Sequence, residues 1–206
     1  MTLTTALIAY VAAAALLTIT PGLDTAIVLR TAAVEGPRRS ALAALGVICG
    51  CLVWGIAVAL GLGILLAASH LAYVILKWAG AAYLAWLGVN LLLEPRAAFD
   101  LDAAPGPRGG NWWLRGFLTN LLNPKVGVFY VSFLPQFVPK DVSPAPFIVL
   151  LAVIHGALGT LWFAGLIAAT TPLKRWLQRT AVVRWLDRLT GVVFLAFGAR
   201  LAFDRR

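Results

Sequence analysis

The chain has 206 residues, of which 61% are hydrophobic and 12% are charged, and its formal net charge is +9. Soluble domains are typically about 45–50% apolar and about 25% charged, and a fold of this size has too little interior to bury so many apolar side chains. The composition therefore excludes a soluble enzyme, a disordered chain and a secreted disulfide scaffold. It predicts a polytopic membrane protein.

Six apolar runs are long enough to cross a bilayer as helices, because a hydrocarbon core of about 30 Å needs roughly 20 helical residues. They cover approximately residues 3–29, 40–68, 74–93, 112–138, 145–169 and 185–203. The first run is interrupted at Pro21-Gly22 and the fourth at Asn123-Pro124. The runs are continuous and show no alternation, so they predict an all-α membrane protein.

The basic residues lie between the apolar runs, where a bilayer sorts them, so we interpret them as a topology signal and expect no nucleic-acid partner. Eleven of the 17 Lys and Arg fall in the connections after the first, third and fifth runs, five fall on the opposite side, and Lys125 lies within a span. The positive-inside rule then predicts both termini outside and these three connections in the cytoplasm. A re-entrant first run would instead give five spans.

Two ten-residue segments share the pattern basic-x-x-Gly-x-x-aromatic-Leu-Ala-aromatic: Lys77–Trp86 and Arg188–Phe197, 111 positions apart. Pro21 and Pro124 match at an offset of 103. Each half then holds three spans, and because three is odd the second half enters the membrane inverted. We predict one transmembrane domain over residues 1–206, with six transmembrane helices in two inverted three-helix repeats (1–93 and 111–206), a polar linker (94–110), and breaks in helices one and four.

The breaks at Pro21, Gly22 and Pro124 lie where a ligand site is expected. Proline lacks a backbone N–H and clashes with the carbonyl four residues back. Carbonyls freed in this way find no water in lipid, so a break must be buried in protein or line a wet cavity. A simple kink is the alternative for either proline alone, but two matched breaks are typical of secondary transporters.

Each break has an ionisable neighbour, Asp24 after the first and Lys125 after the second. A charge deep in a bilayer is costly, so both side chains should face the protein interior and find partners there. One carboxylate and one ammonium complement the two charges of an amino-acid zwitterion. The alternative is a purely structural ion pair. Asp24 is also our candidate for carrying a coupled proton.

A stripe of small and polar residues recurs at intervals of four, three and four in the fourth run: Gly116, Asn120, Asn123 and Gly127. Such a stripe lets helices approach closely and hydrogen-bond across the contact. We therefore place Asn120 and Asn123 at the substrate site, with helix packing as the alternative.

Other polar residues in the spans are candidates for the lining of the same site, namely Thr20, Thr25, Gln136 and His155. A single histidine in an apolar run is either a hydrogen-bonded packing residue or a proton relay or substrate contact. Cys49 and Cys51 are two positions apart on a helix, so their thiols point to opposite faces and cannot pair. We interpret them as buried small residues and predict no metal site and no cofactor.

These residues carry a resemblance to a known family. Thr20–Asp24 reads T-P-G-L-D and resembles the P-G-P-D segment of the lysine-exporter (LysE/RhtB) family, with Leu23 where that family usually has a second proline. Arg115–Lys125 reads R-G-F-L-T-N-L-L-N-P-K and, with Phe129 and the L-P-Q-F of Leu134–Phe137, resembles its G-F-x-x-N-x-x-N-P-K and P-Q-F block. The resemblance extends over the whole chain.

The resemblance implies a multi-pass protein of the cell inner membrane that exports a small amino acid or derivative from the cytoplasm. It also implies a proton motive force as the energy source and a homodimer as the assembly. Two other classes stay open: an inorganic-ion or metal transporter of related fold, and a non-transporting membrane scaffold. We expect no enzyme, because the chain has neither the C-x-x-C nor the H-E-x-x-H pattern of redox or zinc chemistry.

Overall fold

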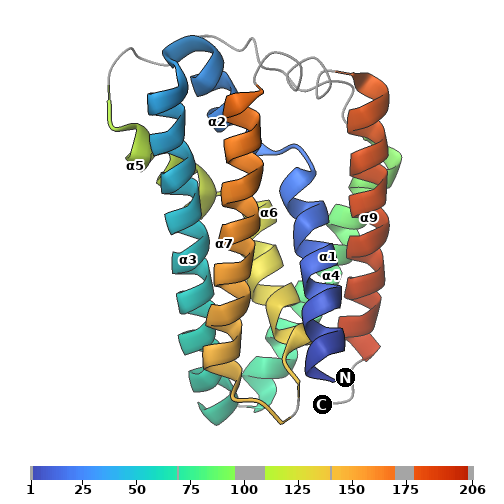
Figure 1. Ribbon diagram of the computed structural model, residues 1–206. Coiled ribbons are helices and arrows are strands. Elements are labelled where there is room, and N and C mark those ends of the chain that lie inside the picture. The colour runs from blue at the N-terminus through green and yellow to red at the C-terminus, as the bar shows by residue number, and fades with distance from the viewer. Residues whose placement is uncertain (1, 69, 96–109, 140, 170–178, 204–206) are drawn as a thin grey trace.

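A computed structural model describes residues 2–68, 70–95, 110–139, 141–169 and 179–203. Nearly all of these residues are helical and none of them forms a strand, which confirms the all-α prediction. The long helices are aligned roughly along one axis and form a bundle. The start of α1 and the end of α9 lie at the same end of this bundle (Figure 1). Most of the predicted linker and part of the connection before α9 lie outside the described residues.

The helices follow the predicted apolar runs closely. They are α1 (Leu3–Ile19), α2 (Leu23–Glu35), α3 (Pro37–Ala68), α4 (His70–Leu93), α5 (Trp112–Leu121), α6 (Pro124–Val128), the π-helical η1 (Phe129–Phe133), the 3-10 helix η2 (Leu134–Phe137), α7 (Pro144–Ala168) and α9 (Thr180–Phe203). The first predicted run is therefore the pair α1 and α2. The fourth is a series of four short helices.

Two helices within the described residues are long and apolar enough to cross a bilayer, over Pro37–Gly61 in α3 and Pro144–Ala168 in α7. The pair α1 and α2 is a third candidate span, bent by 51° at its break. These helices support a multi-pass membrane protein. The count of six spans stays a prediction.

Helix α3 packs against α2, α5 and α7, and α4 packs against α9. Glycines make the contact between α3 and α5 close, because a Cβ at Gly46 or at Gly116 would overlap backbone atoms of the partner helix. At Gly127 a Cβ would lie 2.9 Å from the Trp54 ring of α3. The small residues of the fourth run thus face α3, as close helix packing requires.

An aromatic cluster fills the core beyond the second break. Tyr10, Phe129, Tyr130, Phe133 and Phe137 are almost completely buried, and their rings contact one another with centroids 4.8 to 6.3 Å apart. Three of them lie in η1, whose wider turn is a geometry that often marks functional segments of helices. This cluster packs α1 and the fourth run together beside the site.

Candidate functional site

The two breaks have the local structure that their prolines dictate. Helix α1 ends at Ile19 and α2 begins at Leu23, which leaves Thr20 to Gly22 as the non-helical link. Helix α5 ends at Leu121, and Pro124 starts α6 in the first turn, where its missing N–H costs nothing. The Asn123 side chain caps α6, accepting a hydrogen bond from the Lys125 N–H at 3.1 Å.

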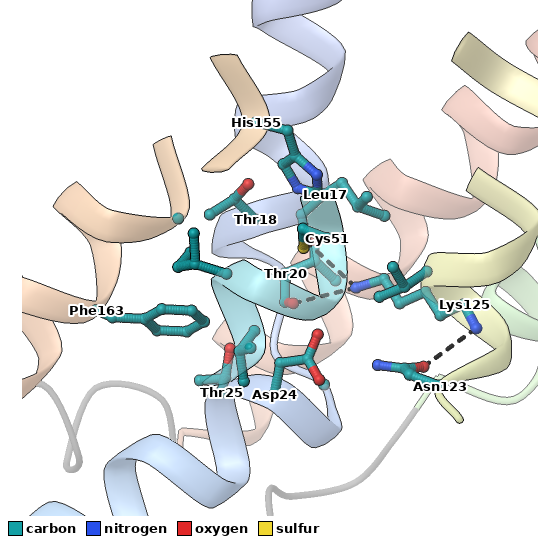
Figure 2. Close-up of a pocket in the computed structure, with 15 residues that line it drawn as sticks. Leu17, Thr18, Thr20, Asp24, Thr25, Cys51, Asn123, Lys125, His155 and Phe163 are labelled. Carbon is teal, nitrogen blue, oxygen red and sulfur yellow. Dashed lines mark hydrogen bonds between the residues drawn. The ribbon is translucent and has the colours of Figure 1, made fainter. Parts of the chain in front are cut away.

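The two breaks meet at one cavity, shown in Figure 2. Its volume is about 40 Å³. The first break contributes Thr20, Gly22 and Asp24 to its wall, and the second contributes Asn123 and Lys125. One negative and one positive side chain from distant parts of the chain thus line a single space.

The carboxylate of Asp24 is held from the second half of the chain. The Asn120 amide donates to Asp24 Oδ2 at 2.8 Å and also approaches Cys51 Sγ at 3.4 Å. Gly50 of α3 makes room for Asn120, since a Cβ there would lie 2.5 Å from Asn120 Oδ1. Asp24 Oδ1 is buried without a hydrogen-bond partner. A buried carboxylate oxygen without a donor is unfavourable, so a ligand that donates to it would remove that cost.

The ammonium of Lys125 replaces the donor that Pro21 removes. In a regular helix the N–H of residue 21 would bond to the Leu17 carbonyl, but proline has no N–H. Lys125 Nζ instead donates to the carbonyls of Leu17 at 3.4 Å and Thr20 at 3.2 Å (Figure 2). Its side chain passes over Gly22, where a Cβ would lie 3.8 Å from Nζ. Lys125 therefore joins the second break to the end of α1.

Thr20 and Thr25 at the first break are both buried, and both line the cavity. The Thr20 hydroxyl donates to the Leu16 carbonyl at 2.6 Å and lies 2.7 Å from the Thr190 hydroxyl of α9. The break is thus tied to α9 as well as to α6.

His155 of α7 lines the cavity and is 6% exposed. Its Nδ1 lies 2.9 Å from the Tyr130 hydroxyl, so the ring is held in one orientation. The histidine is thus a hydrogen-bonded core residue that also forms part of the cavity wall.

Gln136 is not among the residues that line this cavity, and its place at the substrate site stays a prediction. Gln136 lies in η2 and donates to the Ser132 carbonyl at 2.8 Å. Between the second break and Gln136, the wider turn of η1 and the tighter turn of η2 change the rotation per residue.

The sequence analysis did not predict the contacts or the burial of three further residues. Cys51 lines the cavity and touches Asn120, although it reads as a small apolar residue. Tyr130 holds His155 and gave no signal beyond its aromatic character. Asp187 is fully buried in α9, where its position between Arg184 and Arg188 is typical of a solvated helix end.

A charged cavity at the meeting point of two broken helices in an apolar bundle is the architecture of secondary transporters. The described residues thus form an apolar helical bundle that is compatible with a multi-pass membrane protein. The comparisons with known proteins agree with this class.

The sequence model of a family described as LysE type translocator matches residues 15–205. A homoserine/homoserine lactone efflux protein of Salmonella typhi is 31% identical and covers 96% of each chain. The threonine efflux protein of Escherichia coli K12 is 30% identical over 90% of this chain and 91% of its own length. An uncharacterized membrane protein of Bacillus subtilis, YrhP, is 30% identical over 94% of this chain and 97% of its own. The chain belongs to the LysE family, and no solved structure matches it.

Proposed function

We propose that the protein exports a small amino acid or a derivative from the cytoplasm across the cell inner membrane, in exchange for protons. The observation that carries this proposal is the pair of opposite charges, Asp24 and Lys125, in the wall of one cavity at the junction of two helix breaks. A zwitterion needs both charges at once. Neither a bare cation nor a bare anion does.

The geometry suggests how the zwitterion binds. The substrate ammonium pairs with Asp24 Oδ1, which has no hydrogen-bond partner. The substrate carboxylate accepts from Lys125 Nζ, because a charged oxygen is a stronger acceptor than the neutral Leu17 and Thr20 carbonyls that Lys125 contacts in this structure. Binding then releases the end of α1 from Lys125, which links occupancy of the site to movement at the first break.

The names of the relatives support this class of cargo. Threonine, homoserine and homoserine lactone are the compounds in the printed names. Each carries an amino group and a carbonyl oxygen, which are the two groups that Asp24 and Lys125 would hold. A lactone has no free carboxylate, so we place the stricter requirement on the amino group and Asp24.

We keep the inverted repeat as part of the proposal, and the contact between α4 and α9 supports it. Gly88 lies against Gly191, and Ala81 lies against Gly198, so the two helices run antiparallel. The predicted offset of 111 makes α4 and α9 equivalent helices of the two repeats, and equivalent helices of inverted repeats run antiparallel, as these two do. Two such repeats can rock around a central site and open it to either side.

Asp24 is the residue that we propose exchanges a proton. The Asn120 amide donates to the charged carboxylate, and by turning about its side-chain bond it presents its oxygen to a protonated one. Asn120 Oδ1 is buried without a partner and is available for that second arrangement. The site can thus hold Asp24 in both protonation states, as proton-coupled exchange requires.

Uptake into everted membrane vesicles tests the proposal, because transport into them corresponds to export from the cell. We expect uptake of at least one labelled small amino acid, driven by a proton gradient. Asp24→Asn and Lys125→Met should each abolish it, whereas Asp141→Asn, an exposed acid outside the cavity, should not. Equal uptake with and without the protein for every amino acid would refute export. Normal uptake by either cavity variant would place the site elsewhere.

Two finer parts of the proposal have their own measurements. Substrate counterflow, measured without a proton gradient, reports binding and exchange of the substrate separately from proton coupling. Proton release on adding substrate to the vesicles reports the coupling, and it should be present in the wild type and absent in Asp24→Asn. We also carry forward the homodimer that the family resemblance implies, which light scattering on the purified protein in detergent measures.

A further inference from the structure

The cavity has an apolar wall that the binding of the two substrate charges leaves unused. Figure 2 shows the Phe163 ring on one side of the cavity and Lys125 on the other. Val47, Ile48 and Gly159 line the cavity together with Phe163, from α3 and α7. An amino acid held by its ammonium at Asp24 and its carboxylate at Lys125 still has its side chain to place. The apolar wall, which lies opposite Lys125, is free to contact that side chain.

The wall is a packed surface. Ile48 fits into a hollow of α7 formed by two glycines, since a Cβ at Gly156 would lie 3.4 Å from Ile48 Cγ2 and a Cβ at Gly159 would lie 2.8 Å from its Cδ1. Phe163 is 5% exposed and follows Gly159 by one helical turn. Because each side chain is held by its neighbours, the wall does not yield freely to a bulky ligand.

The space beside the wall is small. Its volume is about 40 Å³, which leaves little room for a long substituent. Asp24 is the one acidic residue among those that line it, and the structure of the described residues offers no second carboxylate there. A charged side chain on the ligand would be buried against Ile48 and Phe163 without a partner, which is costly.

From this geometry we infer that Ile48, Gly159 and Phe163 contact the side chain of the transported amino acid and limit it to small, uncharged groups. The inference rests on the proposed function and adds the residues that set specificity. Phe163 and Ile48 define the upper size, and Gly159 keeps the tip of Ile48 out of the cavity.

The test compares uptake of alanine, threonine, leucine, phenylalanine and lysine into everted vesicles. Phe163→Ala and Ile48→Ala remove part of the wall, so each should raise the rate for leucine or phenylalanine relative to threonine by about tenfold or more, as expected for added space in an apolar pocket. Gly159→Ala pushes Ile48 inward and should lower uptake of threonine more than that of alanine. Lysine should stay poorly transported in all three variants.

Phe147→Ala is the matched control, because Phe147 lies on the same helix, is 4% exposed, and does not line the cavity. It should change all rates by one common factor. If the wild type transports amino acids but Phe163→Ala and Ile48→Ala both keep its rate ratios, this inference alone is overturned. A wild type that transports none of them would overturn the proposed function and this inference with it.

Discussion

Gly50→Ala tests the link between helix packing and the Asp24 carboxylate. The new Cβ would lie 2.5 Å from Asn120 Oδ1 and 2.9 Å from Asn120 Cβ, whereas ordinary contact begins at 3.4 Å. The amide can rotate away from the first clash, but the second involves an atom next to the backbone, so α5 has to move by about 0.5 Å, the difference between 3.4 and 2.9 Å. Both changes act on the 2.8 Å hydrogen bond from Asn120 to Asp24.

The size of the effect follows from two opposing terms. Losing a hydrogen bond to a charged group costs about 1.5–3 kcal/mol, and replacing glycine by alanine inside a helix gains about 1 kcal/mol. The net loss of unfolding free energy is therefore about 0.5–2 kcal/mol, or a fall in melting temperature of roughly 1–8 °C for a chain of this length. Substrate export should fall as well, since Asp24 loses its positioning contact.

Gly61→Ala is the control, because Gly61 lies on the same helix with nothing within 4 Å of the added Cβ. It should leave stability unchanged or raise it slightly. Thermal unfolding of the purified protein in detergent, followed by size-exclusion chromatography, measures both variants. If Gly50→Ala proved as stable and as active as Gly61→Ala, the contact between Asn120 and α3 would not support the site.

Two further predictions follow from the same contacts. Lys125→Met should lower the melting temperature more than Lys125→Arg, because methionine cannot donate to the Leu17 and Thr20 carbonyls. Each carbonyl left without a donor costs about 1–3 kcal/mol. Equal melting temperatures for the two variants would contradict the role of Lys125 in joining the two breaks. In a Cys49→Ser background, Cys51 is 5% exposed and should react only slowly with a small thiol reagent, and saturating substrate should slow this labelling further. Labelling at the same rate with and without substrate would place the bound amino acid away from Cys51.

The breaks and their charges were predictable because they depend on local chemistry. A proline removes its own N–H wherever it stands, and a charge in an apolar run must find a protein partner. The pseudo-symmetry of the halves then suggested that Asp24 and Lys125 share one site, and both line one cavity. What the sequence did not indicate was the partner of each, Asn120 for the carboxylate and the α1 carbonyls for the ammonium.

The remaining differences depend on geometry that a single sequence does not encode in a readable pattern. The π-helical turn at Phe129–Phe133 changes the phase of the fourth run, and just after it Gln136 donates to the Ser132 carbonyl. Cys51 and Tyr130 acquire polar roles only through side chains from other helices. Asp187 is buried because α9 packs into the bundle, although its two arginine neighbours suggest an exposed turn.

The central claim is that Asp24 and Lys125 hold the two charged groups of one small ligand, and binding of matched analogues tests it most directly. Calorimetry on the purified protein would compare the best exported amino acid with its N-acetyl form, which lacks the ammonium, and its methyl ester, which lacks the carboxylate. We expect the wild type to bind both analogues more weakly than the amino acid. Asp24→Asn should no longer distinguish the amino acid from the N-acetyl form, and Lys125→Met should no longer distinguish it from the ester. If both variants kept the full wild-type preference, the two side chains would not be the ligand's partners.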